Sequence, residues 1–172
     1  MNLHNRTRYP DKIIAAVVTR AGNHAGANIE GVQVIINQGR KATVSGLAYY
    51  ADSVRIDKVK ETTNGGWFSL SIPCWHLWDT AQRAKCRVDA VELAYRIYWT
   101  AFHEWHHIHE YQMMEEGYYF PWSRRKNGRR PAYKDRPEEI RAMGAEAEAR
   151  SQPLDRQTQA AVLALAMWME GQ

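Results

Sequence analysis

Cysteine is scarce in this chain of 172 residues, which contains only Cys74 and Cys86. Two cysteines cannot build a disulfide framework, and these two do not form a CxxC pair. A chain without such a framework does not depend on an oxidising compartment. We therefore expect reduced thiols in a cytoplasmic protein.

Long hydrophobic runs are also missing. The longest one, Ala160 to Met169, is too short to cross a bilayer as a helix. The first residues, Met1 to Lys12, are polar and lack the apolar segment of a signal peptide. These absences predict a protein that is neither secreted through a signal peptide nor inserted into a membrane.

The overall composition is that of a folded chain. Hydrophobic residues make up 45% of the sequence, charged residues make up 24%, and seven tryptophans are present. This composition argues against wholesale disorder, and the length suits a single domain with its own core, spanning residues 1–172. The formal net charge of +4 permits an anionic partner such as nucleic acid but does not require one.

Strand patterns come before helix patterns along most of the chain. A short helix is predicted over Asp11–Ala21, because Pro10 precedes it and a Gly-Asn pair ends it. Four β-rich segments separated by turn residues follow: Val32–Asn37, Thr43–Tyr50, Ser53–Val59 and Trp67–Ile72. Strands grouped before helices indicate an α+β fold with an N-terminal helix.

The second half of the chain is predicted to be helical. No proline or glycine occurs from Asp79 to Met114, which favours one long helix or two short ones. A further helix is expected from Pro137, because proline suits a first helical turn, and a last amphipathic helix is expected over Leu154–Glu170. Within the long segment one apolar stripe recurs at helical spacing: Ala90, Ala94, Ile97, Ala101, Trp105 and Ile108.

The sequence His103-Glu104-Trp105-His106-His107 is an HExxH motif on this predicted helix. Histidines four residues apart place their imidazoles on one face, about one turn apart, where both can bind a single zinc ion. Glu104 points to one side, so it is better placed to accept a proton from a metal-activated water than to bind the metal. The motif therefore predicts Zn²⁺ as the cofactor and Glu104 as a general base.

Two alternatives to this interpretation come from the same stretch. The histidines could be surface or core residues in a locally His-rich segment, which also contains His106 and His109. His106 and Glu110 form a rival pair four residues apart, but no glutamate follows His106 directly to serve as a base. We expect His106, His109 and Glu110 to form a solvated face.

A third protein ligand is needed, because a catalytic zinc usually has three. No histidine follows His109, and His4, His24 and His76 lie upstream in unsuitable contexts. A downstream carboxylate is the better candidate. Glu139 and Glu146 each begin an ExxA step and lie on one helical face about 10 Å apart, so only one of them can reach the metal.

The HExxH helix followed by a glutamate in ExxA resembles the gluzincin group of zinc peptidases. The chain is similar to minimal gluzincins and to phage-type and prokaryotic metallopeptidases, over about residues 43–149. The resemblance implies a zincin-like fold with a small mixed β-sheet, and an endopeptidase in which an edge strand of that sheet binds an extended substrate. It implies His103, His107 and Glu139 as zinc ligands and Glu104 as the base.

The chain departs from the gluzincin pattern in two places. The connection from His107 to Glu139 is long and contains an aromatic segment, Tyr118–Trp122, followed by several arginines. This loop is interpreted either as a packed aromatic cluster with a basic turn, as a lid over the cleft, or as a nucleic-acid contact. Many gluzincins also place a tyrosine or histidine donor after the glutamate ligand, and neither residue type follows Tyr133 here.

Zinc-dependent hydrolysis of a peptide or protein substrate is the function that the sequence favours. The alternatives are another zinc amidohydrolase, such as a deformylase, and a non-catalytic metal-containing binding protein that associates with nucleic acid. A deformylase uses a cysteine ligand within its own motif, and neither cysteine here has that setting. Ser53–Val59, which alternates polar and apolar residues, is the segment expected to form the substrate-binding edge strand.

Overall fold

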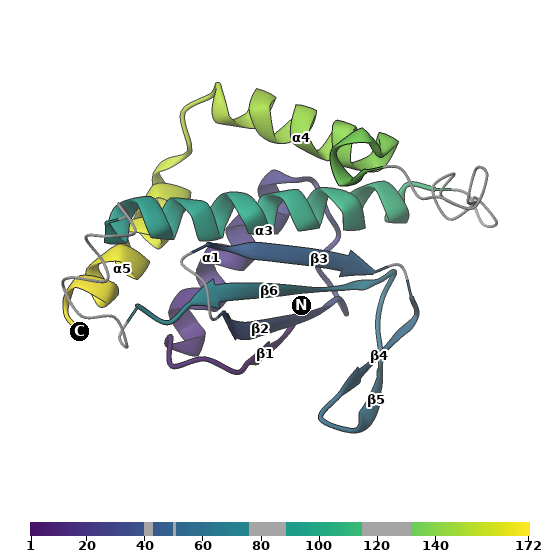
Figure 1. The fold of residues 1–172 in the computed structure, drawn as a ribbon, viewed down its shortest axis with the longest axis horizontal. Helices are drawn as coiled ribbons and strands as arrows, with labels where there is room; N and C mark the ends of the chain where they lie inside the picture. The colour runs from purple at the N-terminus through teal and green to yellow at the C-terminus, as the bar shows by residue number, and fades with distance from the viewer. Residues whose placement is uncertain (40–42, 50, 76–88, 115–131) are drawn as a thin grey trace.

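The computed structural model describes residues 1–39, 43–49, 51–75, 89–114 and 132–172. Its main sheet has the strand order β1-β2-β6-β3. The strands are Asn2–Asn5 (β1), Gln33–Gly39 (β2), Trp67–Pro73 (β6) and Ser45–Tyr49 (β3). The first three are mutually parallel, whereas β3 runs antiparallel to β6 and lies at one edge of the sheet (Figure 1).

Four α-helices and one short 3-10 helix complete the described structure. They are Asp11–His24 (α1), Ala90–Gln112 (α3), Tyr133–Asp135 (η3, the 3-10 helix), Pro137–Arg150 (α4) and Arg156–Glu170 (α5). The α+β class predicted from the order of the segments is therefore confirmed. Among the described helices, none combines the length and apolar character that spanning a bilayer requires.

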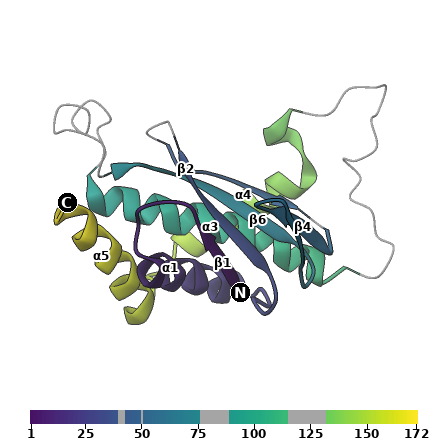
Figure 2. The ribbon, with the colours of Figure 1, turned by 90° about the horizontal axis from the view of Figure 1, so that it is seen from below.

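Helix α3 is the central element, because it contacts β3 and β6 of the sheet as well as α1, α4 and α5. In Figure 1 it runs between α4 and the sheet, and Figure 2 shows the same arrangement from below. The apolar stripe predicted from the sequence is buried throughout its length. Trp105 in this stripe meets Phe68 of β6 edge-to-face, with ring centroids 4.9 Å apart. This packing leaves the opposite side of α3 to face α4.

The helix boundaries follow local capping chemistry. Helix α3 begins at Ala90 because the side chain of Asp89 accepts a hydrogen bond from the backbone N–H of Glu92, 2.7 Å away. Residues 76–88, where the sequence predicted the first turns of this helix, lie outside the described part of the chain. Helix α4 has Pro137 in its first turn, as predicted. Strand β1 was not predicted, since its four residues are mostly polar.

The prediction that Ser53–Val59 forms the substrate-binding edge strand is wrong. Within the described ranges, Ser53–Ile56 (β4) pairs only with Val59–Thr62 (β5), and the two form a separate hairpin. The apolar residues of β4, Val54 and Ile56, pack on Ile35, whose neighbours in β2 point into the main core. Successive strand residues alternate between faces, so the hairpin covers the face of the sheet away from the helices.

Candidate metal centre

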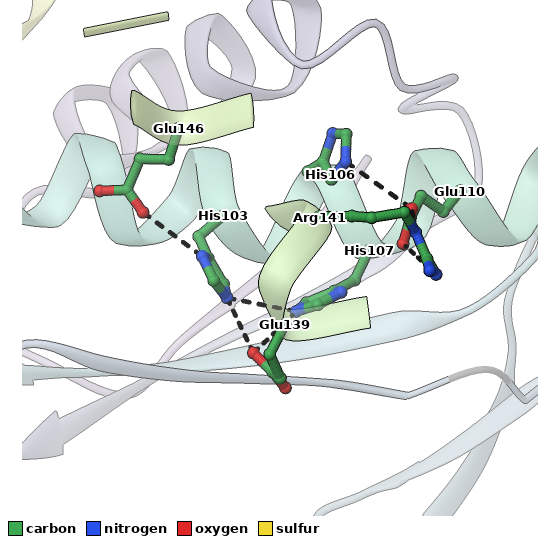
Figure 3. Close-up of polar contacts among 7 residues, drawn as sticks. All are labelled: His103, His106, His107, Glu110, Glu139, Arg141 and Glu146. Carbon is green, nitrogen blue, oxygen red and sulfur yellow. Dashed lines mark hydrogen bonds and ion pairs between the residues drawn. The ribbon is translucent and has the colours of Figure 1, made fainter. Parts of the chain in front are cut away.

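Three side chains from two helices converge at one point beside the sheet. His103 and His107 come from successive turns of α3, and Glu139 comes from the first turn of α4. The Nε2 atoms of the two histidines lie 3.2 Å apart. Oε2 of Glu139 lies 3.2 Å from Nε2 of His103 and 3.4 Å from Nε2 of His107 (Figure 3). All three residues are buried.

The spacing of these three atoms fits a tetrahedral metal ion. Ligand atoms at about 2.0–2.1 Å from such an ion are separated from one another by roughly 3.3 Å. The three measured separations, 3.2, 3.2 and 3.4 Å, form a triangle of that size. Two imidazole nitrogens and one carboxylate oxygen are also donors that divalent transition metals accept. His103, His107 and Glu139 are therefore a group that can hold a metal ion, with a fourth position left for another ligand.

The electrostatics of this group favour a bound cation. Burial by itself would lower the pKa of His103, but hydrogen bonds to Glu139 and Glu146 outweigh it and raise that pKa to about 9. Burial would raise the pKa of Glu139, but hydrogen bonds from both histidines and from the Tyr133 hydroxyl lower it well below its usual range. The carboxylates thus stabilise positive charge at His103, and a metal ion that displaces the proton would occupy the same favourable field.

Glu104 lies beside the metal-binding group without joining it. Its side chain is only 3% exposed, and it lines the same cavity as His107 and Glu139. Burial is the largest influence on this carboxyl and raises its pKa to about 7, although the two histidines and a hydrogen bond from the backbone N–H of Ala48 oppose the shift. A buried carboxyl with a pKa near neutrality can exchange a proton at physiological pH.

Glu146 contacts His103 from the other side of the imidazole ring. Its Oε2 lies 3.3 Å from Nδ1 of His103, whereas Glu139 faces Nε2 (Figure 3). Arg150, one turn further along α4, donates to the other oxygen of Glu146 at 2.6 Å. Of the two glutamates that the sequence left open, the structure therefore places Glu139 at the convergence point and Glu146 behind His103.

The two histidines differ in their outer nitrogens. Nδ1 of His107 is buried and has no hydrogen-bond partner among the described residues. Oε2 of Glu138 is also buried without a hydrogen-bond partner among the described residues. Glu138 also lines the cavity, but it does not belong to the group that can hold a metal. Consecutive residues are rotated by about 100° around a helix, and this rotation separates the carboxylates of Glu138 and Glu139.

A cavity of about 130 Å³ opens beside the metal-binding group. Its walls come from β3, α3, the η3 segment and the start of α4: Gly46, Leu47, Ala48, Glu104, His107, Tyr133, Arg136, Glu138 and Glu139. Tyr133 and the β3 residues were not predicted from the sequence as part of the site. Tyr133 precedes Glu139 by six residues, whereas the gluzincin pattern directs attention to residues that follow it.

The other described histidines are not part of the metal-binding group. His4 contacts Gln33 at 2.8 Å, and His24 contacts the hydroxyl of Tyr98 at 2.7 Å. His106 and His109 are half-buried rather than fully solvated, and Glu110 forms an ion pair with Arg141 of α4. His76 and the aromatic and basic loop from Tyr118 to Arg130 lie outside the described residues.

Comparison of the chain with protein families, with curated proteins and with solved structures returns no match. The functional interpretation therefore depends on the geometry and chemistry of the site itself.

Proposed function

We propose that this chain is a zinc-dependent peptidase of the gluzincin type. The observation that carries the proposal is the triangle formed by His103, His107 and Glu139, with a buried glutamate beside it. Two imidazoles, one carboxylate and an open fourth position form the ligand set of many catalytic zinc sites. A purely structural zinc site is usually closed by four protein ligands and has no need of Glu104.

Each residue around the proposed zinc site has a separate role in hydrolysis. A zinc ion held by the three ligands would supply Lewis-acid activation of water and of the scissile carbonyl. Glu104 accepts the proton of the attacking water and passes it to the leaving amine, a role that suits its raised pKa. The hydroxyl of Tyr133, at the cavity wall, donates to Glu139 in this structure and would turn from that carboxylate to the oxygen on which negative charge develops.

Strand β3 is the proposed binding edge for an extended peptide. Among the described residues it pairs only with β6, so its other side has backbone groups available for a further strand. Gly46, Leu47 and Ala48 of this strand line the cavity beside the metal-binding group. A peptide that adds to β3 would pass in front of Glu104, which accepts a hydrogen bond from the backbone of Ala48.

The alternative is a metal-containing binding protein without catalysis, and Glu104→Gln distinguishes the two. Wild type, reconstituted with zinc, should bind one zinc ion per chain and cleave a quenched-fluorescence peptide library. Chelation should stop the cleavage and added zinc should restore it. Glu104→Gln should retain the zinc but lose about 10²–10⁴-fold in kcat, because the variant lacks a general base.

Four other outcomes of these zinc-binding and cleavage assays would contradict different parts of the proposal. Wild-type protein that binds no zinc contradicts the metal centre. Protein that binds zinc but cleaves no peptide favours the non-catalytic alternative, and cleavage of N-formyl peptides alone favours a different amidohydrolase. Loss of zinc from Glu104→Gln would make Glu104 a ligand instead of the base.

A further inference from the structure

Strand β3 and helix α3 approach each other most closely at Gly46. A methyl group built on Gly46 would lie 2.6 Å from Cδ of Glu104 and closer still to its Cγ and Oε1. The three nearest heavy atoms to that methyl group therefore all belong to Glu104, and separations below 3.0 Å do not occur in folded proteins. The carboxyl of Glu104 occupies the space that any side chain at position 46 would need.

Backbone conformation does not explain a glycine at this position. Among the glycines that the structure describes, those with positive φ are Gly26, Gly31, Gly65 and Gly66, and Gly46 is not one of them. Glycine within a strand normally weakens it, since it has no side chain to pack and loses more conformational entropy on folding. Close approach of another group is the remaining physical reason for glycine here.

Glu104 has little freedom to avoid a side chain at position 46. It is only 3% exposed and accepts a hydrogen bond from the backbone N–H of Ala48, two residues further along β3. The overlap would include Cγ as well as the carboxylate, so rotation of the carboxylate alone would not relieve it. Either Glu104 or the strand must move when Gly46 is replaced.

We propose that Gly46 is a positioning residue that lets β3 hold the Glu104 carboxylate in place beside the metal-binding group. The inference rests on the proposed function, since it assigns Gly46 to the placement of the proposed base. Gly46 and the Ala48 backbone act together: the first leaves room for the carboxyl, and the second donates a hydrogen bond to it. The nearest atoms to the new methyl group belong to Glu104 and not to His103, His107 or Glu139, so a Gly46→Ala variant is expected to keep its metal-binding group.

The activity test compares Gly46→Ala with Gly144→Ala. Position 144 in α4 is the matched control, because a methyl group there meets no atom within 4 Å. Gly46→Ala should retain one zinc per chain and lose roughly 10²-fold in kcat with little change in KM, the size of effect that a misplacement of about 1 Å produces. Gly144→Ala should match wild type in both. Unchanged kcat in a zinc-loaded Gly46→Ala protein would overturn the proposal.

Removal of the Glu104 side chain tests whether Gly46 acts through it. Glu104→Ala removes both Cγ and the carboxyl, the atoms that occupy the space that the new methyl group needs. On the residual kcat of Glu104→Ala, Gly46→Ala should therefore cause less than a third of the fold loss that it causes in wild type. An equal loss in both backgrounds would mean that Gly46 does not act through Glu104.

Thermal unfolding tests the contact without any assay of hydrolysis. Overpacking should make Gly46→Ala lower Tm by about 2–4 °C or more in the wild-type background. In the Glu104→Ala background the same substitution should leave Tm unchanged, because the space is then empty. Equal Tm losses in both backgrounds would overturn the steric claim. If wild type cleaves no peptide, the proposed function fails and Gly46 loses its catalytic role, whatever the Tm cycle shows about the contact.

Discussion

The two ends of α4 present similar side chains to the same histidine with different consequences. Glu139 at the start of the helix and Glu146 near its end are two turns apart on one face. Both carboxylates contact His103, at 3.2 Å from Nε2 and at 3.3 Å from Nδ1 respectively. Glu139 also reaches His107, whereas Glu146 is paired with Arg150.

In the proposed metal centre, the ring nitrogen that each carboxylate faces, more than its distance from His103, would separate a ligand from a supporting residue. The Nε2 atoms of His103 and His107 face each other, so a metal ion bound between them has access to Glu139. Nδ1 points away from that space and carries the proton when Nε2 binds a metal. Glu146 is placed to accept that proton in a hydrogen bond, which fixes the orientation of the ring and strengthens it as a ligand.

The largest expected effect comes from the Glu139 end of the helix. Glu139→Gln should reduce bound zinc from one ion per chain to a trace and abolish hydrolysis, since a neutral amide is a poor zinc ligand. Elemental analysis after dialysis measures the stoichiometry. Glu148→Gln, an exposed residue of the same helix, is the control and should bind zinc like wild type. Zinc retained in Glu139→Gln but lost in Glu146→Gln would reverse the two assignments.

Tyr133 supports the Glu139 end of α4, because its hydroxyl donates a hydrogen bond to that carboxylate. Tyr133→Phe should keep the zinc and lose about 10²–10³-fold in kcat, the usual cost of removing one oxyanion donor. Tyr49→Phe on β3, which does not line the cavity, is the matched control and should be near wild type. If Tyr133→Phe loses zinc instead, the hydroxyl supports the ligand and does not act on the substrate.

Much of the site was predictable because local spacing determines it. The stripe through Trp105 identified the buried side of α3, and the HExxH motif identified the side that faces α4. The ExxA steps identified Glu139 and Glu146, and the sequence favoured Glu139 without fixing the choice. That choice depends on where α4 crosses α3, which is a tertiary property that no spacing within either helix encodes.

The parts that the sequence did not reveal depend on contacts between distant segments. Gly46 is close to Glu104, and Tyr133 lines the cavity beside the metal-binding group. Both contacts join segments far apart in the sequence, so no motif around either residue predicts them. The alternation in Ser53–Val59 predicted a half-buried strand, which in the structure covers only Ser53–Ile56 before a turn at Asp57 and Lys58. It could not indicate which face of which sheet the apolar residues cover. Strand β1 is short and polar, and it forms because β2 offers a parallel partner.

The Glu146 end of the helix should give an intermediate effect. Glu146→Ala should weaken zinc binding by about 10–100-fold without changing the stoichiometry, as expected for a residue that orients a ligand. Glu146→Gln should weaken it less, because the amide oxygen can still accept a hydrogen bond from Nδ1 of His103. Competition with a chromophoric chelator measures both affinities. An affinity for Glu146→Ala equal to that of wild type would show that His103 does not need this support.

Arg150 is the outermost member of this arrangement and should give the smallest effect. Its guanidinium donates to Glu146 at 2.6 Å and lies 5.0 Å from the centroid of the Trp99 ring. Half of its side chain is exposed to solvent, and exposed pairs one turn apart on a helix contribute about 0.3–0.5 kcal/mol. Arg150→Met should therefore weaken zinc binding only about twofold. In the Glu146→Ala background the same substitution should have no effect on affinity, because Arg150 reaches the metal centre only through that carboxylate. A twofold loss that persists without Glu146 would show that the arginine acts by another route, such as its contact with Trp99.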